Sequence, residues 1–149
     1  DQDGDMDLII CNGDSFDNNF ANRSHGVQWI ENLGDMQFRF HRLLDLPGAY
    51  AAKAGDMDND GDLDILVVAN LPETVDPVSL QSSNPPSIVV LEQTELKNFA
   101  TRILSRDAPR YTSLELGDFN NDGKMDFTIG ASVISASMPI PRITVWSQK

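Results

Sequence analysis

Short apolar segments recur three times along the chain, at residues 8–11, 63–69 and 125–129, and each follows an acidic loop. The segments are apolar almost throughout and shorter than typical helices, which favours β-strands. A strand with one solvated face would alternate apolar and polar residues. The continuous apolar pattern therefore predicts strands that are covered on both faces.

Further segments around these strands repeat as well. In the middle repeat, strands are predicted at about 50–54, 63–69, 88–93 and 98–104. Residues 29–32 match residues 90–93 at an offset of 61, Phe38 and Leu43 match Phe99 and Leu104 at the same offset, and residues 144–148 begin the pattern again. The fourth strand of each repeat mixes phenylalanine with basic residues, as expected of an outer edge that stays polar.

The three acidic loops share one spacing of residues that can bind a metal ion. In the complete loops, Asp or Asn stands at positions 1, 3 and 5, Gly at position 6 and Asp at position 9. The candidate ligands are Asp1, Asp3, Asp5 and Asp7 in the first loop, Asp56, Asp58, Asp60, Asp62 and Asp64 in the middle loop, and Asp118, Asn120, Asp122, Lys124 and Asp126 in the last loop. Ca²⁺ takes about 6 to 8 oxygen ligands, and alternate carboxylates converge on one ion if the backbone curls around it. The spacing therefore predicts two to three bound calcium ions.

The loop positions have different roles. Glycine at position 6 permits a positive φ. Position 7 offers its backbone carbonyl, so a lysine can stand there, and the aspartate at position 9 is the candidate closing ligand. An EF-hand would need glutamate at position 12, whereas Ile10, Val67 and Ile129 occupy that position here, inside the next strand.

The repeat spacing predicts an array of similar modules. The aspartates at position 9 are 57 and 62 residues apart, and repetition at such a period indicates a repeat architecture. Four short antiparallel strands per repeat are typical of propeller blades. We therefore predict an all-β fold, a β-propeller fragment with a partial blade at 1–46, a full four-stranded antiparallel blade at 47–106 and a partial blade at 107–149.

Two segments resemble a known family. Residues 55–67, Gly-Asp-Met-Asp-Asn-Asp-Gly-Asp-Leu-Asp-Ile-Leu-Val, and residues 31–38, Glu-Asn-Leu-Gly-Asp-Met-Gln-Phe, are similar to the FG-GAP/VCBS repeats of integrin-α-like β-propellers. The resemblance implies calcium loops between the first two strands of each blade, a parent of about seven blades, and export. This chain would be about two and a half blades of such a parent, and its first loop begins at position 3, so we expect a part of a longer protein. The chain departs from the family pattern at 94–97, where the Asn-x-Gly turn is lost, and at Asn120, where Asp is usual.

Composition narrows the functional classes. The formal net charge is −12, which argues against a nucleic-acid partner because such proteins need basic patches. No apolar stretch is long enough to span a bilayer. Cys11, the single cysteine, lies in an apolar strand and is expected to be a buried thiol. Weak calcium sites suit a calcium-rich exterior, so we expect an extracellular or cell-surface location, with the periplasm as the alternative.

Three functional hypotheses stay open. The first is binding or adhesion to a protein or glycan, with structural calcium and with residues 14–26 and 70–87 as recognition loops. The second is a polysaccharide-active enzyme, which would need cationic and tyrosine side chains to converge on one face: Arg23, Lys53, Arg110 and Tyr111. The third is a carrier module beside an enzymatic or haem domain. The fold alone does not decide among them.

Four aromatic or imidazole side chains are assigned structural roles. His25 is expected in a loop and His41 on the surface of an outer strand, and neither is expected to be catalytic. Trp29 and Trp146 occupy similar strand positions, so we expect them to pack between blades.

Overall fold

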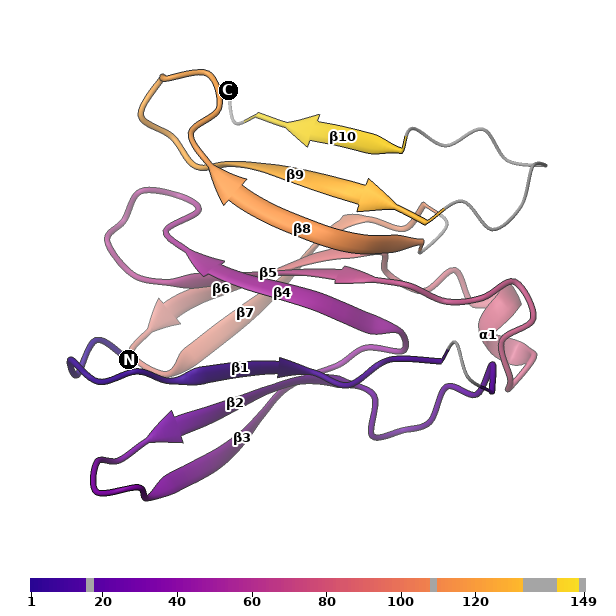
Figure 1. Cartoon of the computed structure of the whole chain (residues 1–149), viewed down its shortest axis with the longest axis horizontal. Coiled ribbons are helices and arrows are strands. Elements are labelled where there is room, and N and C mark those ends of the chain that lie inside the picture. Colours follow the sequence, from indigo (N-terminus) through magenta and orange to yellow (C-terminus); the bar gives the residue numbers. More distant parts are fainter. Residues whose placement is uncertain (16–17, 108–109, 133–141, 148–149) are drawn as a thin grey trace.

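Ten short antiparallel strands carry the fold in the computed structural model, which describes residues 1–15, 18–107, 110–132 and 142–147 (Figure 1). The strands are β1 (Leu8–Cys11), β2 (Gly26–Asn32), β3 (Phe38–Asp45), β4 (Ala49–Gly55), β5 (Asp64–Ala69), β6 (Ile88–Glu95), β7 (Asn98–Ser105), β8 (Tyr111–Gly117), β9 (Asp126–Ala131) and β10 (Ile143–Trp146). One short helix, α1 (Ser79–Ser82), lies between β5 and β6. The four strands predicted for the middle repeat are confirmed as β4 to β7.

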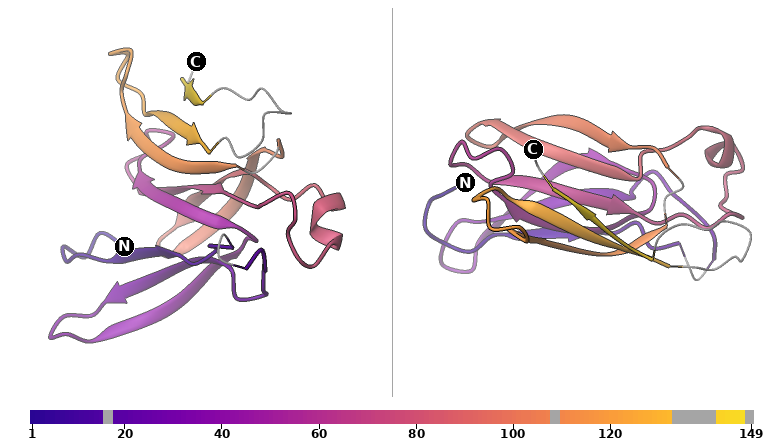
Figure 2. Two further views of the ribbon diagram at one scale, coloured as in Figure 1. Left: turned by 45° about the vertical axis from the view of Figure 1, so that its right-hand side comes forward. Right: turned by 90° about the horizontal axis from the view of Figure 1, so that it is seen from above.

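The strands form three sheets in which each strand pairs with its neighbours in sequence. The sheets have the orders β1-β2-β3, β4-β5-β6-β7 and β8-β9-β10, and all pairs are antiparallel. They are stacked face to face (Figures 1 and 2). The fold is therefore all-β, with the sheet arrangement of a β-propeller fragment, as predicted.

Alternation along β5 shows why the middle sheet is apolar on both sides. Ile65 and Val67 belong to the hydrophobic cluster shared with the first sheet, whereas Leu66 and Val68 belong to the cluster shared with the third sheet. All four side chains are buried. Successive side chains of a strand point to opposite faces, so a strand between two neighbouring sheets needs an apolar residue at every position.

The innermost strands hold adjacent sheets together. Strand β4 packs against β1 and β2 on one side and against β8 on the other. A glycine allows the close approach to the third sheet, because a Cβ atom at Gly55 would lie only 2.8 Å from Cδ1 of Leu116.

Strand β1 differs from the prediction that it is covered on both faces. Ile9 and Cys11 pack against the cluster shared with the middle sheet, but Leu8 is 49% exposed and Ile10 is 41% exposed. Phe40 of β3 lies in the same cross-strand row as Leu8 and is 61% exposed. No described sheet packs against this face, so the apolar composition of β1 is matched by burial on one side only. Cys11 was expected to be buried and is half-buried, and this burial raises the pKa of its thiol to about 11.

The connections between β1 and β2 and between β5 and β6 lie at the end of the sheets opposite the acidic loops (Figure 1). Their backbones join where the Ala21 amide donates to the Asp76 carbonyl (2.8 Å) and the Asp76 amide donates to the Asn19 carbonyl (2.7 Å). Beneath this junction Ala21 forms a small buried cluster with Leu71 and Val75. The two predicted recognition loops are therefore one packed unit.

Candidate metal centre

The acidic loops lie at one end of the sheets because each leads into the second strand of its repeat. The first loop precedes β1, the middle loop joins β4 to β5, and the last loop joins β8 to β9. Figure 1 shows all three loops on the same side of the molecule. Antiparallel pairing within each sheet and stacking between sheets thus bring the three repeats of one motif into similar surroundings.

The middle loop wraps around its own carboxylates. The Asp60 amide donates to Oδ1 of Asp56 (3.2 Å) and Oδ1 of Asp58 (3.3 Å), and the Gly61 amide donates to Oδ2 of Asp56 (3.1 Å). The Asp62 amide donates to Oδ1 of Asp60 (3.0 Å). Such bonds to ionised acceptors are stronger than neutral ones. As a result, oxygen atoms of Asp56, Asp58 and Asp60 lie within 4.8 Å of one another.

Two residues with positive φ produce this curl. Asn59 has φ of 65° and Gly61 has φ of 97°. The last loop has the same pair, with φ of 60° at Asn121 and 81° at Gly123. Asn tolerates the left-handed region better than most residues. The glycine predicted the turn at position 6, whereas the turn at position 4 was not predicted, although the asparagine there favours it.

The last loop repeats the hydrogen-bond scheme of the middle loop. The Asp122 amide donates to Oδ1 of Asp118 (3.1 Å) and to Oδ1 of Asn120 (2.8 Å), and the Gly123 amide donates to Oδ2 of Asp118 (2.9 Å). The Lys124 amide donates to Oδ1 of Asp122 (2.9 Å). One added bond runs from Nδ2 of Asn120 to Oδ2 of Asp122 (3.1 Å), so the asparagine satisfies a carboxylate that would otherwise face like charge.

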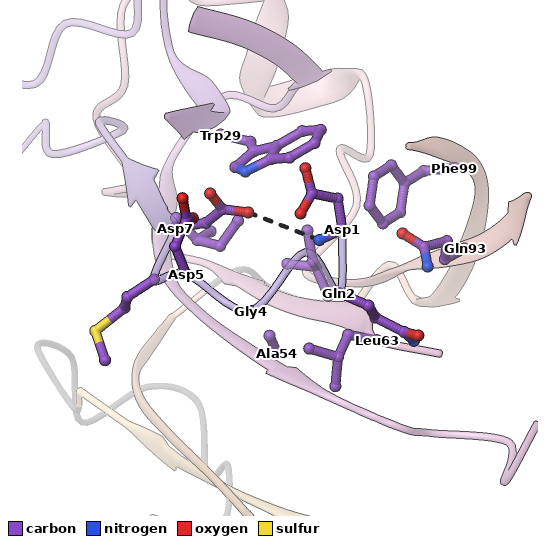
Figure 3. Close-up of a pocket in the computed structure, with 13 residues that line it drawn as sticks. Asp1, Gln2, Gly4, Asp5, Asp7, Trp29, Ala54, Leu63, Gln93 and Phe99 are labelled. Carbon is purple, nitrogen blue, oxygen red and sulfur yellow. Dashed lines mark ion pairs between the residues drawn. The ribbon is translucent and has the colours of Figure 1, made fainter. Parts of the chain in front are cut away.

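The first loop, which begins at position 3, repeats two hydrogen bonds of the middle loop. The Asp3 amide donates to Oδ1 of Asp1 (3.3 Å) and the Asp5 amide to Oδ1 of Asp3 (3.1 Å), as at the equivalent positions of the middle loop. The Asp1 amino group lies 3.7 Å from Oδ2 of Asp7 (Figure 3). Nε2 of Gln2 donates to the Gly61 carbonyl (3.0 Å), which links the first two loops.

The aspartate at position 9 joins its loop to the third strand of the same sheet. In the middle loop, Oδ2 of Asp64 accepts from the Met57 amide (3.1 Å) and Oδ1 accepts from the Gln93 amide (2.9 Å). Asp64 is only 1% exposed and lies outside the group of three converging carboxylates. The structure thus shows an anchoring role that sequence reasoning missed, while its role as closing ligand stays a prediction.

Each of the other loops shows one of these two bonds at position 9. Oδ1 of Asp7 accepts from the Asn32 amide (2.8 Å), and Oδ2 of Asp126 accepts from the Phe119 amide (3.1 Å). Asn32 of β2 is equivalent to Gln93 of β6, which bonds to Asp64 in the middle loop. Asp7 therefore bonds to the next strand and Asp126 to its own loop, and Asp64 of the middle loop makes both kinds of bond.

The pKa values of the loop aspartates shift in different directions. Burial, followed by the neighbouring charge of Asp60, raises the pKa of Asp62. Burial also raises the pKa of Asp64, against the opposing effect of its two backbone N–H bonds. In the last loop, the Gly123 amide lowers the pKa of Asp118. Burial and neighbouring carboxylates thus oppose the ionisation of Asp62 and Asp64, and a cation bound in the middle loop would favour it.

The donor set of the middle loop fits a hard divalent cation. Ligand distances of about 2.3 to 2.6 Å place two oxygens of one calcium shell up to about 5 Å apart, and the three carboxylate oxygens lie within 4.8 Å of one another. Oδ1 of Asp62 is also buried without a hydrogen-bond partner in the part of the chain that the structure describes. Asp56, Asp58 and Asp60 would hold the ion. Among the described residues, only the middle loop brings three carboxylates together in this way.

A buried polar cluster beside the first loop was not predicted. Glu31 of β2 is 1% exposed, and its Oε2 lies 2.6 Å from Nε2 of His41 and 3.3 Å from Nη1 of Arg39. Its Oε1 accepts a hydrogen bond from Nζ of Lys97, in the turn between β6 and β7. These partners, Lys97 first and His41 second, lower the pKa of Glu31 to about 2.

His41 lies on the outer strand β3 as expected, but its side chain is half-buried rather than on the surface. Its ring stacks on Trp29 with 4.4 Å between ring centroids, and it binds Glu31. The expected packing role of Trp29 is confirmed, since the side chain is 4% exposed and lies between the first two sheets (Figure 3). Trp146 stacks on Phe127 at 5.5 Å. His25 lies in a loop as predicted, but it is buried.

Residues 1–67 match the family model of the FG-GAP-like repeat. The match covers the first acidic loop, the first sheet, β4, the middle acidic loop and the start of β5. It confirms the resemblance that the two sequence segments indicated. Neither the curated proteins nor the solved structures gave a significant match. Within the described ranges, the structure has no helix of the length and apolar character that crossing a membrane requires.

Proposed function

We propose that this chain, which carries an FG-GAP-like repeat, is a calcium-binding propeller segment of a secreted protein. Calcium has a structural role in it, and the segment takes part in binding or adhesion to a protein or glycan. The observation that carries the calcium assignment is the convergence of Asp56, Asp58 and Asp60 within 4.8 Å. The last loop supports it by repeating the hydrogen bonds of the middle loop.

The chemistry of the donors favours calcium over softer metals. The converging side chains of the middle loop are all carboxylates, and hard oxygen ligands suit Ca²⁺, Mg²⁺ or Mn²⁺. Mg²⁺ needs near-ideal octahedral geometry and keeps several waters, whereas Ca²⁺ accepts flexible loops with more protein ligands. A loop that offers carboxylates at three alternate positions and a carbonyl at position 7 supports the larger ion.

A structural role follows from the position of the loop. The middle loop connects β4, which packs against both neighbouring sheets, to β5, which is buried on both faces. Ordering this loop fixes the start of β5. The Asp64 carboxylate also accepts a hydrogen bond from the Gln93 amide, so the loop is connected to β6 as well. A bound ion would therefore stabilise the sheet itself.

The binding role rests on the opposite end of the sheets. There the connections from two neighbouring sheets pack into one unit that exposes Phe20 (45%) and Val78 (68%). Recognition often resides in loops that a rigid scaffold positions. The enzymatic alternative receives less support, because Lys53 forms an ion pair with Glu115 (2.9 Å) and Arg110 forms one with Glu73.

The test of the calcium assignment is a pair of melting curves in calcium and in chelator. A ligand that binds only the native state contributes about 2.7 kcal/mol at 100 times its Kd. A chain of this size gains about 2 to 4 °C per kcal/mol, so we expect an increase in Tm of about 5 to 10 °C in calcium.

Two substitutions separate site binding from general charge. Asp58→Asn should remove most of the calcium-dependent increase in Tm and weaken calcium binding in calorimetric titration. Asp35→Asn is the matched control, because Asp35 is an exposed acid in the turn between β2 and β3, outside the acidic loops. Equal melting temperatures of the parent chain in calcium and in chelator would refute the calcium assignment.

A further inference from the structure

The side chain of Lys97, a residue of the middle sheet, contacts acidic residues of the first sheet and its loop. Lys97 lies in the turn between β6 and β7, where the family's Asn-x-Gly turn is lost, and its backbone has φ of 67°. Its Nζ donates a hydrogen bond to Oε1 of Glu31 and lies 2.9 Å from Oδ2 of Asp1. The same Nζ is 5.9 Å from the centre of the Trp29 ring.

Both acids that Lys97 contacts are buried. The side chain of Asp1 is 2% exposed and that of Glu31 is 1% exposed. Asp1 lines a pocket of about 410 Å³ between the first loop and the middle sheet, where Figure 3 shows its carboxylate between Trp29 and Phe99. A buried carboxylate is costly unless a cation or a set of hydrogen bonds compensates it. Lys97 supplies that cation to both acids.

The repeats show what is special about this contact. Asp1 is equivalent to Asp58, one of the three carboxylates that converge in the middle loop. Across the described residues, no lysine or arginine forms an ion pair with Asp58. The residue equivalent to Lys97 in the first sheet is Met36, which also has positive φ (59°) and is 85% exposed.

We propose that the Lys97 ammonium group is a built-in cation at the first acidic loop, which neutralises the position-3 carboxylate and so lowers the affinity of that loop for calcium. The same contact pins the middle sheet to the first sheet through Glu31. The proposal rests on the proposed calcium-binding function for its first part. The pinning of the two sheets is independent of calcium.

Lys97 and a calcium ion would compete for the Asp1 carboxylate because both are positively charged. Calcium in the first loop would use the Asp1 carboxylate that Lys97 now occupies, and an ammonium group within about 4 Å repels the ion. The Coulomb interaction of unit charges at 4 Å corresponds to about a fivefold change in affinity even in water, and to more in a buried site. Calcium binding at the first loop therefore has to displace Lys97 from Asp1 or accept this repulsion.

Terbium luminescence can report on the first loop alone. Tb³⁺ is a hard trivalent ion that emits when a nearby tryptophan is excited, and Trp29 lines the pocket that contains Asp1. Trp146 lines a second pocket that contains Asp58, and thus reports on the middle loop. In a Trp146→Phe background, the Trp29-sensitised signal measures the first loop. Calorimetry with Ca²⁺ on the parent chain and on Asp58→Asn measures the middle loop, because the heat that this substitution removes belongs to that loop.

The decisive variant is Lys97→Met, which copies the residue of the equivalent turn. We expect first-loop terbium affinity to rise about fivefold or more, with middle-loop calcium affinity unchanged, and Tm in chelator to fall. Lys97→Arg, which keeps the charge, should leave first-loop affinity low. Because Lys97→Met leaves Glu31 without its main partner, the double variant Glu31→Gln/Lys97→Met is measured as well, and it should keep the high first-loop affinity.

The outcomes separate this inference from the proposed function. Unchanged first-loop affinity in both Lys97→Met variants, with calcium still bound by the middle loop, would overturn the inference and leave the proposed function standing. Absence of calcium binding at the middle loop would overturn the proposed function. Equal Tm values of the parent chain and Lys97→Met in chelator would overturn the pinning of the two sheets.

Discussion

Backbone conformation, rather than space, accounts for the glycine at position 6 of each acidic loop. A Cβ atom built at Gly4, Gly61 or Gly123 would meet no atom within 4 Å. All three residues have φ between 81° and 97°, a region that other L-residues enter at a cost. The residue is thus selected by the turn that it makes possible.

Gly61→Ala should therefore destabilise the chain without a steric clash. Placing an L-residue with a Cβ in the left-handed region costs about 1 to 2 kcal/mol, and urea denaturation in chelator measures it. Gly61→Asn is the matched control and should cost less, since asparagine already adopts φ of 65° two residues earlier. An alanine variant as stable as the parent would show that the loop relaxes to another conformation.

Asn120→Asp should change the last loop in opposite directions with and without calcium. The substitution adds a ligand charge, and charge count is one determinant of calcium affinity, so calorimetry should show tighter binding. In chelator it removes the amide that donates to Asp122 and adds repulsion, so Tm should fall. Weaker calcium binding would indicate that loop geometry, and not ligand charge, limits this site.

Glu31 should make stability depend on acid pH. Its hydrogen bonds to Lys97 and His41 lower the pKa from 4.5 to about 2. A lowered pKa in the folded state contributes stability that is present above about pH 4.5 and is lost as the pH falls toward 2. The Tm difference between the parent and Glu31→Gln in chelator should therefore be largest near neutral pH and shrink below pH 4.5.

Glu92→Gln is the matched control for this pH dependence. Glu92 is the equivalent residue of the middle sheet, but its side chain is 36% exposed and lies 3.6 Å from Arg102. Its substitution should change Tm little at any pH, because exposed ion pairs contribute little. A Tm difference for Glu31→Gln that is constant from pH 7 to 3 would contradict the electrostatic account.

At the scale of the secondary-structure elements, the loop and the third strand of the middle sheet form one connected unit. Asp64→Ala removes the acceptor of both the Met57 and the Gln93 amides. Leaving buried donors unsatisfied costs about 1 to 3 kcal/mol, so this variant should lose stability in urea even with chelator present.

Asp60→Ala is the comparison for that experiment. Asp60 is exposed and belongs to the converging carboxylates, so its loss should weaken calcium binding while changing stability in chelator much less. If Asp64→Ala and Asp60→Ala were equally stable in chelator, position 9 would act only as a ligand and not as an anchor.

The elements were predictable where the repeats impose a period. The continuous apolar residues of β5 predicted burial on both faces, and the alternation between two hydrophobic clusters confirms it. For β1 the same pattern predicts burial on both faces, and the described sheets cover only the face that carries Ile9 and Cys11. The strand was predicted correctly, and its composition does not tell which face the described sheets cover.

Contacts between sheets were the part that the sequence did not reveal. Glu31 and Lys97 are 66 residues apart, and their contact depends on how two sheets stack. In the sequence, residues 94–97 show only a departure from the family's turn pattern. Such a departure indicates an altered turn, but it does not predict that the Lys97 side chain contacts Glu31. The same limit applies to Asp64, whose backbone partners come from another strand.

At the scale of the whole molecule, the outer face of the first sheet exposes an apolar surface. Leu8, Ile10, Phe38 and Phe40 are 41% to 61% exposed on this face. Exposed apolar patches favour association, so residues 1–149 should self-associate in light scattering and bind a hydrophobic dye.

Ile10→Glu/Phe40→Glu should reduce both signals, since the substitutions place charge in the exposed patch without entering a core cluster. Leu96→Glu is the control, because Leu96 is 63% exposed but lies in the turn between β6 and β7. A monodisperse parent chain that binds no dye would show that this face does not drive association.

The joined connections at the end opposite the acidic loops have a consequence for how this surface can diversify. Because Ala21 and Asp76 bond across the two connections and Ala21, Leu71 and Val75 share one buried cluster, neither connection keeps its shape alone. A change of length in one would have to be matched in the other, so the two segments should be inherited, grafted or redesigned as a pair. The last acidic loop, whose described hydrogen bonds all lie within the loop, carries no such joint constraint and can be exchanged alone, whereas Gln2 and Gly61 link the first loop to the middle loop.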